Sequence, residues 1–251
     1  MAGHSKWANR KHRKFRADAQ KGKIFTKMAR ELTVAAREGG SDPEANVRLR
    51  LAIQKAKEAN MPNQNIDRAI QKGVGSQEAD AYKSATLEGY GPGGVAMLLE
   101  ALTDNRNRTV AEVRNVFSKF GGNLGEAGCV SWIFKRKGYL QILVQDVSLD
   151  EEELMSKAIE AGAEDFKNED EYYEIITSSD ELVAVKEELV NDGIMINRAE
   201  LTMLPQNTVS VSGYEDAKVL LNLMETLEDI DDVQNVYANF EIPEEIFAQV
   251  E

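Results

Sequence analysis

Hydrophobic residues recur every three to four positions through the first third of the chain, and this spacing predicts amphipathic helices. The first helix begins at Ile24 and ends at Gly39-Gly40. The second runs to about Ala59, and a short third helix stops at Gly73-Val74-Gly75. Because the connections are short, we expect these helices to form one all-helical module over residues 23–79.

The pattern changes after residue 80, where short apolar runs alternate with amphipathic stretches. A helix rich in Val and Phe, closed by Gly121-Gly122, lies between the first two of these runs. Three more helices are predicted by capping boxes, in which a serine precedes a glutamate by three residues, at Ser148, Ser178 and Ser212. We expect strands near residues 95–99, 129–134, 140–144, 165–167, 172–177, 194–204 and 233–240.

Taken in order, these elements give βαβ, then a complete βαββαβ unit, then βαβ. A complete unit between two halves is typical of one α+β domain inserted into another. We therefore expect a multidomain α and α+β protein: an N-terminal three-helix module followed by two βαββαβ-like domains, one inserted in the other. The outer domain covers residues 80–135 plus 199–251, and the inserted one residues 136–198. Two consecutive domains are the alternative.

The distribution of charge favours nucleic acid as a partner, although the net charge of the 251 residues is −13. Residues 1–75 contain 17 Lys and Arg against 7 Asp and Glu, whereas residues 76–251 contain 13 against 36. Asymmetry of this size is typical of a polyanion-binding module attached to an acidic body. The net charge of the whole chain therefore hides a basic N-terminal part.

The basic residues are densest in residues 1–22, which have little apolar periodicity and which we interpret as an arm. Lys and Arg neutralise phosphates and release counterions, and aromatic side chains among them can stack on unpaired bases. A solvated tail is the alternative. The candidate nucleic-acid-binding residues of the arm and the helices are His4, Lys6, Trp7, Arg10, Lys11, His12, Arg13, Lys14, Phe15, Arg16, Lys21, Lys23, Lys27, Arg30, Lys55, Lys57, Arg68 and Lys72.

Two further segments could bind phosphate. Thr103–Thr109 lies where a strand meets a helix N-terminus, and helix N-termini bind anions, so Arg106 and Arg108 join the candidates. A plain N-cap at Asn107 explains the segment equally well. The glycine-rich Glu88–Gly94 fits neither G-x-G-x-x-G nor a P-loop, and we interpret it as a tight turn before a strand.

The chain has one cysteine and two histidines, which disfavours catalytic and metal sites. A structural zinc site needs about four Cys or His ligands, and no Ser/His/Asp or Cys/His set can be assembled, because both histidines lie in the arm. We expect no catalytic residue, metal, cofactor or small-molecule substrate, and we place Cys129 in the core. No apolar run is long enough to span a membrane. A single cysteine favours a reducing compartment, the cytoplasm. The expected state is a monomer.

Five motifs along the chain are distinctive: Met1–Ala8, Lys21–Phe25, Tyr90–Gly94, Asn105–Thr109 and Val130–Phe134. They closely resemble motifs of the YebC family, and the resemblance covers essentially the whole chain. It implies a helical first domain and two related α+β domains. It also implies two competing roles: bacterial members are described as DNA-binding transcriptional regulators, whereas the mitochondrial relative is a translational activator, and bacterial relatives are reported to act on ribosomes stalled at proline-rich sequences.

Of these roles we favour a translation factor that binds the ribosome and its RNA. An extended basic arm with interleaved aromatic residues suits ribosomal RNA, and no helix-turn-helix with an obvious recognition helix is visible. A regulator that binds double-stranded DNA is the alternative. An enzyme that uses paired carboxylates is a remote third possibility.

Overall fold

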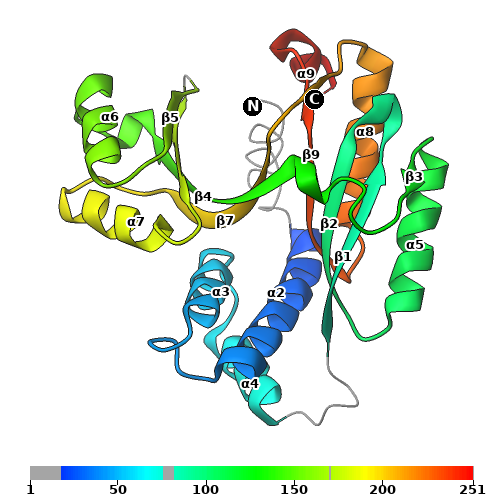
Figure 1. Ribbon diagram of the computed structural model, residues 1–251. Coiled ribbons are helices and arrows are strands. Elements are labelled where there is room, and N and C mark those ends of the chain that lie inside the picture. Colours follow the sequence, from blue (N-terminus) through cyan, green and yellow to red (C-terminus); the bar gives the residue numbers. More distant parts are fainter. Residues whose placement is uncertain (1–17, 76–81, 170, 251) are drawn as a thin grey trace. The chain divides into compact units, whose positions relative to one another are not determined.

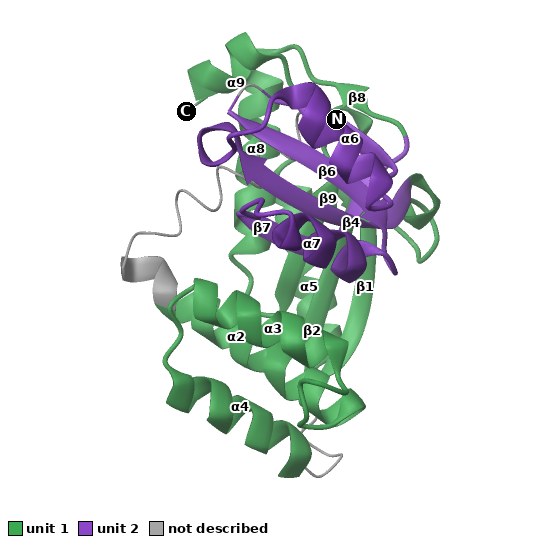
Figure 2. Ribbon diagram, turned by 90° about the vertical axis from the view of Figure 1, so that its left-hand side faces the viewer, with its two compact units in different colours: residues 1–133, 207–251 green, residues 134–206 purple. Residues whose placement is uncertain are grey.

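The structure, a computed structural model, describes residues 18–75, 82–169 and 171–250. The chain folds into two compact units, which Figure 2 shows in green and purple. Unit 1 is Met1–Ile133 together with Asn207–Glu251, and unit 2 is Phe134–Gln206. The fold is mixed α+β with an N-terminal helical module, as the sequence predicts (Figure 1).

Three helices open unit 1: α2 (Asp18–Gly39), α3 (Val47–Glu58) and α4 (Asn63–Gly75). α2 begins six residues earlier than the apolar pattern predicts. The core between the helices consists of small and branched side chains, which lets the helix axes approach closely. Its buried members are Leu32, Ala35, Ala36, Leu49, Ala52, Ala56, Met61, Ile66 and Ala69.

Two positions fix how these helices pack. The Asn46 side chain caps α3 by accepting a hydrogen bond from the Leu49 N–H at 3.0 Å, and it donates to the Ala35 carbonyl oxygen of α2 at 2.8 Å. At Gly73, a Cβ would lie 2.3 Å from the Thr33 carbonyl oxygen. Only glycine therefore permits this approach of α4 to α2.

The rest of unit 1 is built on a four-stranded sheet in the order β3-β1-β2-β9, in which every neighbouring pair is antiparallel. The strands are β1 (Lys83–Tyr90), β2 (Ala96–Thr103), β3 (Asn123–Leu124) and β9 (Val233–Ala238). Helices α5 (Arg106–Lys119) and α8 (Tyr214–Glu228) share one core with this sheet. Smaller elements complete the unit: η2 (Pro92–Gly94), η3 (Ser131–Ile133), β8 (Val209–Ser210), β10 (Phe240–Glu241) and α9 (Glu244–Val250).

Unit 2 is a complete βαββαβ unit, as expected. Its sheet has the order β5-β6-β4-β7, with every neighbouring pair antiparallel, and α6 and α7 share its main core. Ser178 Oγ accepts a hydrogen bond from the Glu181 N–H at 3.2 Å, just before α7. The elements are β4 (Phe134–Leu143), η4 (Val144–Asp146), α6 (Glu151–Glu160), β5 (Asp165–Asn168), β6 (Tyr172–Ser178), α7 (Leu182–Asn191) and β7 (Arg198–Pro205).

Two expectations about the outer sheet are wrong. The sequence predicts no strand where β1 lies, because only Leu87 of this strand joins the apolar core while its neighbour Glu88 is a buried carboxylate. The apolar run at 129–134 is not one strand: Ser131–Ile133 form the short helix η3, and only Phe134 is in a strand, as the first residue of β4. The Glu88 carboxylate accepts hydrogen bonds from the backbone N–H groups of residues 128, 130 and 131 at 2.7–2.8 Å. These bonds hold the run away from a sheet.

The capping boxes predicted at Ser148 and Ser212 do not form. α6 is capped by Asp150, whose carboxylate accepts a hydrogen bond from the Glu153 N–H at 2.8 Å. A carboxylate is a stronger acceptor than a hydroxyl, which explains the later start of the helix. α8 begins at Tyr214 with no side-chain cap.

The limits expected for the inserted domain, residues 136 and 198, differ from those of unit 2. β4 and β7 pair from Phe134 opposite Pro205 to Gln141 opposite Arg198, so both strands belong to one sheet. The whole of β7 therefore lies in unit 2. The division of unit 1 into an arm, a helical module and an outer α+β domain stays a prediction.

Candidate nucleic-acid interface

Residues 1–17 of the predicted arm lie outside the described residues, so the geometry below is that of the helices and the outer sheet. Lys21 lies in α2. The predicted residues that fall outside are His4, Lys6, Trp7, Arg10, Lys11, His12, Arg13, Lys14, Phe15 and Arg16.

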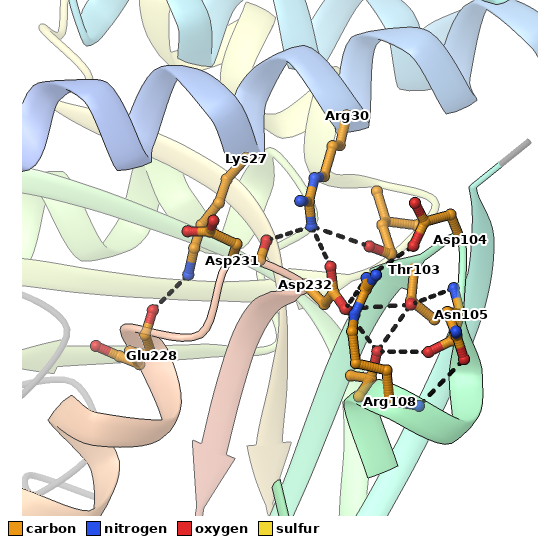
Figure 3. Close-up of polar contacts among 11 residues, drawn as sticks. Lys27, Arg30, Thr103, Asp104, Asn105, Arg108, Glu228, Asp231 and Asp232 are labelled. Carbon is orange, nitrogen blue, oxygen red and sulfur yellow. Dashed lines mark hydrogen bonds and ion pairs between the residues drawn. The ribbon is translucent and has the colours of Figure 1, made fainter. Parts of the chain in front are cut away.

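The basic stripe of α2 consists of Lys23, Lys27 and Arg30. It contacts the acidic turn at residues 228–232, which joins α8 to β9 (Figure 3). Lys23 Nζ lies 3.6 Å from Asp229 Oδ2, and both side chains are about half exposed. Lys27 donates a hydrogen bond to the Glu228 carbonyl oxygen, and Arg30 Nη1 donates one to the Asp231 carbonyl oxygen at 2.7 Å. The positive charges of this stripe are therefore engaged within unit 1.

Asp232 is the centre of this contact and is only 3% exposed. Its Oδ1 accepts a hydrogen bond from Arg30 Nη1 at 2.5 Å. Its Oδ2 accepts from Thr109 Oγ1 at 2.6 Å, Arg108 Nη2 at 2.9 Å and Thr103 Oγ1 at 3.2 Å. One carboxylate of the acidic turn thus joins α2, the end of β2 and the first turns of α5 (Figure 3).

The surroundings of Asp232 favour its charged form. Burial by itself would raise the pKa of Asp232, but hydrogen bonds from Thr109, Arg108 and Arg30 outweigh burial and lower that pKa. The hydrogen bonds to Asp232 and Asp104 raise the pKa of the Arg108 guanidinium. The Asp232 carboxylate is therefore the acceptor of a charge-assisted hydrogen-bond network, and both of its oxygens accept hydrogen bonds.

The Thr103–Thr109 segment is structural on one side and exposed on the other. Asn105, rather than Asn107, caps α5, because its Oδ1 accepts a hydrogen bond from the Arg108 N–H at 3.1 Å. The Arg108 guanidinium also lies 2.7 Å from an Asp104 oxygen. Arg106 is exposed. Of the two arginines predicted to bind anions here, Arg108 is held by two carboxylates of unit 1 and only Arg106 is not.

Four of the predicted cations are exposed on α3 and α4: Lys55, Lys57, Arg68 and Lys72. Arg68 and Lys72 are four residues apart on one face of α4, where they line a groove of about 390 Å³ between α4 and α2. Tyr82 also lines this groove. No sequence pattern marks Tyr82, because it is a single aromatic residue ahead of a strand that the apolar pattern does not predict.

The glycine-rich segment forms the tight turn that the sequence predicts. Gly91 N–H donates to the Val95 carbonyl oxygen at 2.8 Å, and the turn joins β1 to β2. Gly93 and Gly94 have φ values of 70° and 76°, which favour glycine. The shape of this segment is thus explained by chain reversal, without a bound phosphate.

Cys129, which the sequence places in the core, is only half-buried. Burial and the neighbouring Glu88 carboxylate raise the pKa of its thiol, so it is protonated at neutral pH. Within the described ranges, no group of three His, Cys, Asp or Glu could hold a metal ion. In the same ranges, no helix has the length and apolar character that crossing a membrane requires.

Models of two known protein domain families match this chain. "TACO1/YebC protein N-terminal domain" matches residues 5–76, and "TACO1/YebC second and third domain" matches residues 82–240. The chain belongs to the TACO1/YebC family. The family resemblance seen in its motifs is therefore confirmed, and the boundary between the two matches falls between α4 and β1.

Relatives in the TACO1/YebC family are similar over their full length. A protein of Desulfitobacterium hafniense (strain DSM 10664 / DCB-2) is 56% identical over 98% of both chains. One of Halothermothrix orenii is 54% identical over 100% of this chain and 99% of its own. Each is named a probable transcriptional regulatory protein. The crystal structure of a conserved hypothetical protein from Aquifex aeolicus is 52% identical, with a TM-score of 0.82 over 90% of this chain and 93% of that one.

Proposed function

We propose that this TACO1/YebC protein is a non-catalytic regulator of gene expression that binds nucleic acid through its N-terminal module. Its target on this proposal is the ribosome, where it relieves stalling at proline-rich sequences. The observation that carries the proposal is the division of charge, 17 Lys and Arg against 7 acids in residues 1–75 and 13 against 36 in the remainder. A polyanion is attracted to the first part and repelled by the second.

The contacts within unit 1 separate the cations that are held by the fold from those that can bind a ligand. Lys23, Lys27 and Arg30 are engaged by the acidic turn at residues 228–232. Lys57, Arg68 and Lys72 are exposed on α3 and α4 and make no ion pair with that turn, and along the sequence they follow the cations of the arm. The proposed interface is therefore the arm together with the outer surfaces of α3 and α4.

Ribosomal RNA is favoured over duplex DNA by the aromatic residues within the arm. Trp7 and Phe15 stand among basic residues, and aromatic side chains hold single-stranded RNA by stacking on unpaired bases. Bases in a DNA duplex are already stacked and present only their edges. A duplex-DNA regulator is the second candidate, and it is favoured by the names of the relatives, which call them probable transcriptional regulatory proteins.

The test measures binding of the purified protein to ribosomes and to duplex DNA at matched salt, from about 50 to 200 mM, over which phosphate-dominated affinity changes most. We expect saturable ribosome binding that persists at the upper salt, and duplex binding that is weak there. Duplex binding that is steeply salt-dependent, with no ribosome association, would contradict the translation role and support the DNA regulator.

A further inference from the structure

The groove between α2 and α4 is cationic and partly aromatic. It has a volume of about 390 Å³, and none of its described lining residues is acidic. Arg30, Arg68 and Lys72 supply positive charge, and Phe25 and Tyr82 supply aromatic surface. Ligand pockets of a few hundred Å³ hold molecules of the size of a nucleotide. Charge and surface together suit an anion that carries a flat ring.

The Tyr82 ring is held in place within this groove. The Arg30 Cζ atom lies 5.1 Å from the ring centroid, and Lys72 Nζ lies 5.6 Å from it, so two cations contact the ring. The backbone is fixed as well, because Arg37 Nη2 donates to the Tyr82 carbonyl oxygen at 2.7 Å. A ring that is positioned before binding loses little entropy when a base stacks on it.

Hydrogen-bond donors at the groove are available to an acceptor. Arg30 is committed to Asp232 through Nη1, and its Nε is buried, so Arg30 contributes charge rather than a free donor. Arg68 is exposed, and no ion pair with a described carboxylate engages it. The guanidinium of Arg68 and the ammonium of Lys72 can therefore donate hydrogen bonds to a phosphate.

We propose that this groove binds one unpaired nucleotide of single-stranded RNA, with its base against Tyr82 and its phosphate near Arg68 and Lys72. The proposal rests on the proposed function and names the part of the RNA that unit 1 reads. A base within a duplex cannot enter, because both of its faces are stacked on neighbours. The groove therefore selects a loop, a bulge or a single strand.

The test compares groove variants with a matched pair elsewhere in unit 1. Lys218 Nζ lies 5.7 Å from the centroid of the exposed Tyr214 ring, a distance close to the 5.6 Å between Lys72 Nζ and the Tyr82 ring. The variants are Tyr82→Leu, Tyr82→Trp, Lys72→Gln and Arg68→Gln, and the controls are Tyr214→Leu and Lys218→Gln. The probe is a fluorescent uridine oligomer of about 12 nucleotides, a length that covers a typical single-strand site. Ribosome binding is measured on the same samples.

We expect Tyr82→Leu to weaken oligomer binding about tenfold, since stacking on an aromatic residue contributes that much or more, and Tyr82→Trp to retain it. Lys72→Gln and Arg68→Gln should each lower the slope of log affinity against log salt by about 0.7. The controls should match the wild type.

Three results would overturn the proposal. The first is groove variants that match the controls while the wild type binds ribosomes, which leaves the proposed function standing. The second is a wild type that binds neither probe, which removes the proposed function as well. The third is equal loss in Tyr82→Trp and Tyr82→Leu with unchanged melting temperatures. If Tyr82→Leu does not fold, the exposed positions 68 and 72 decide the test through their salt slopes.

Discussion

Two basic surfaces of the helical module use the same residue types in opposite ways. On α2, Arg30 is 13% exposed and lies against the buried carboxylate of Asp232. On α4, Arg68 and Lys72 are exposed and line a groove without described acids. The difference lies in the contacts: Arg30 lines the same groove but is held by Asp232, whereas Arg68 and Lys72 make no ion pair with a described carboxylate.

The number of Lys and Arg residues in residues 1–75 is therefore larger than the number that can bind a ligand. The positive charge of this segment has two roles, one in the fold and one in binding. Part of the positive charge of residues 1–75 fastens α2 to the acidic turn at residues 228–232, and only the remainder can bind a polyanion. The prediction that follows is that variants of the two surfaces separate into those that change stability and those that change affinity.

The largest effect is expected from Asp232→Ala. This substitution leaves the guanidinium of Arg30 buried without its anion, and removing one partner of a buried ion pair destabilises by about 3–5 kcal/mol. Thr109 and Thr103 lose an acceptor at the same time. Urea unfolding followed by circular dichroism measures the change. Unfolding like that of the wild type would show that the contact does not hold α2.

Acid should act on the same contact. Because the folded pKa of Asp232 is lowered, its charge stabilises the fold fully above the ordinary aspartate pKa of about 4, and this stability is lost as the pH falls through the lower folded value. Asp232→Asn should therefore be less stable at neutral pH and lose less stability between about pH 5 and pH 2 than the wild type does. A parallel pH dependence in both proteins would contradict this.

The next largest effect is expected from the arm. Replacing Lys6, Arg10, Lys11, Arg13 and Lys14 by Ala removes up to five phosphate contacts, so the salt slope should fall by about 3 and affinity near 0.1 M salt by up to about a thousandfold. Ribosome or RNA binding at several salt concentrations measures this. The melting temperature should stay nearly unchanged; a large drop would mean that the arm is packed structure rather than a binding element.

The fold was predictable wherever apolar periodicity carries it. The three helices of the module and the βαββαβ order of unit 2 follow from the spacing of apolar residues and from the glycines that end helices. β1 was not predictable, because Glu88 is buried where an apolar residue is expected, and its hydrogen bonds to residues 128–131 have no signal in the local sequence. A long-range polar contact replaces the local pattern there.

The residue types of the candidate site were predictable from the sequence, but the contacts that these residues make were not. The sequence identifies Arg30, Arg68 and Lys72 as basic residues of helices, yet it cannot show that Asp232, some 200 residues away, engages the first of them. Tyr82 has no pattern that marks it, since its role depends on α2 and α4 approaching each other at Gly73. Contacts distant in sequence decide both outcomes.

A smaller effect separates two arginines of one segment. Arg108 is bound by Asp104 and Asp232, whereas Arg106, two residues earlier, is exposed. Arg108→Gln should lower the melting temperature, by less than Asp232→Ala does, because one donor of the network is lost. Arg106→Gln should leave the melting temperature unchanged and reduce RNA affinity at most a few-fold, by one phosphate contact. Equal melting temperatures for the two variants would contradict the assignment.

The smallest effect is expected at Lys23, which lies on the border between the two surfaces. Its ion pair with Asp229 is 3.6 Å long, and the side chains are 51% and 56% exposed, so water screens it and it contributes about 0–1 kcal/mol. Lys23→Gln should therefore change the urea midpoint very little, as should Asp229→Asn. RNA can compete for such a weakly held cation. If it does, Asp229→Asn tightens RNA binding slightly and Lys23→Gln weakens it, whereas no change in either would assign Lys23 wholly to the inward surface of α2.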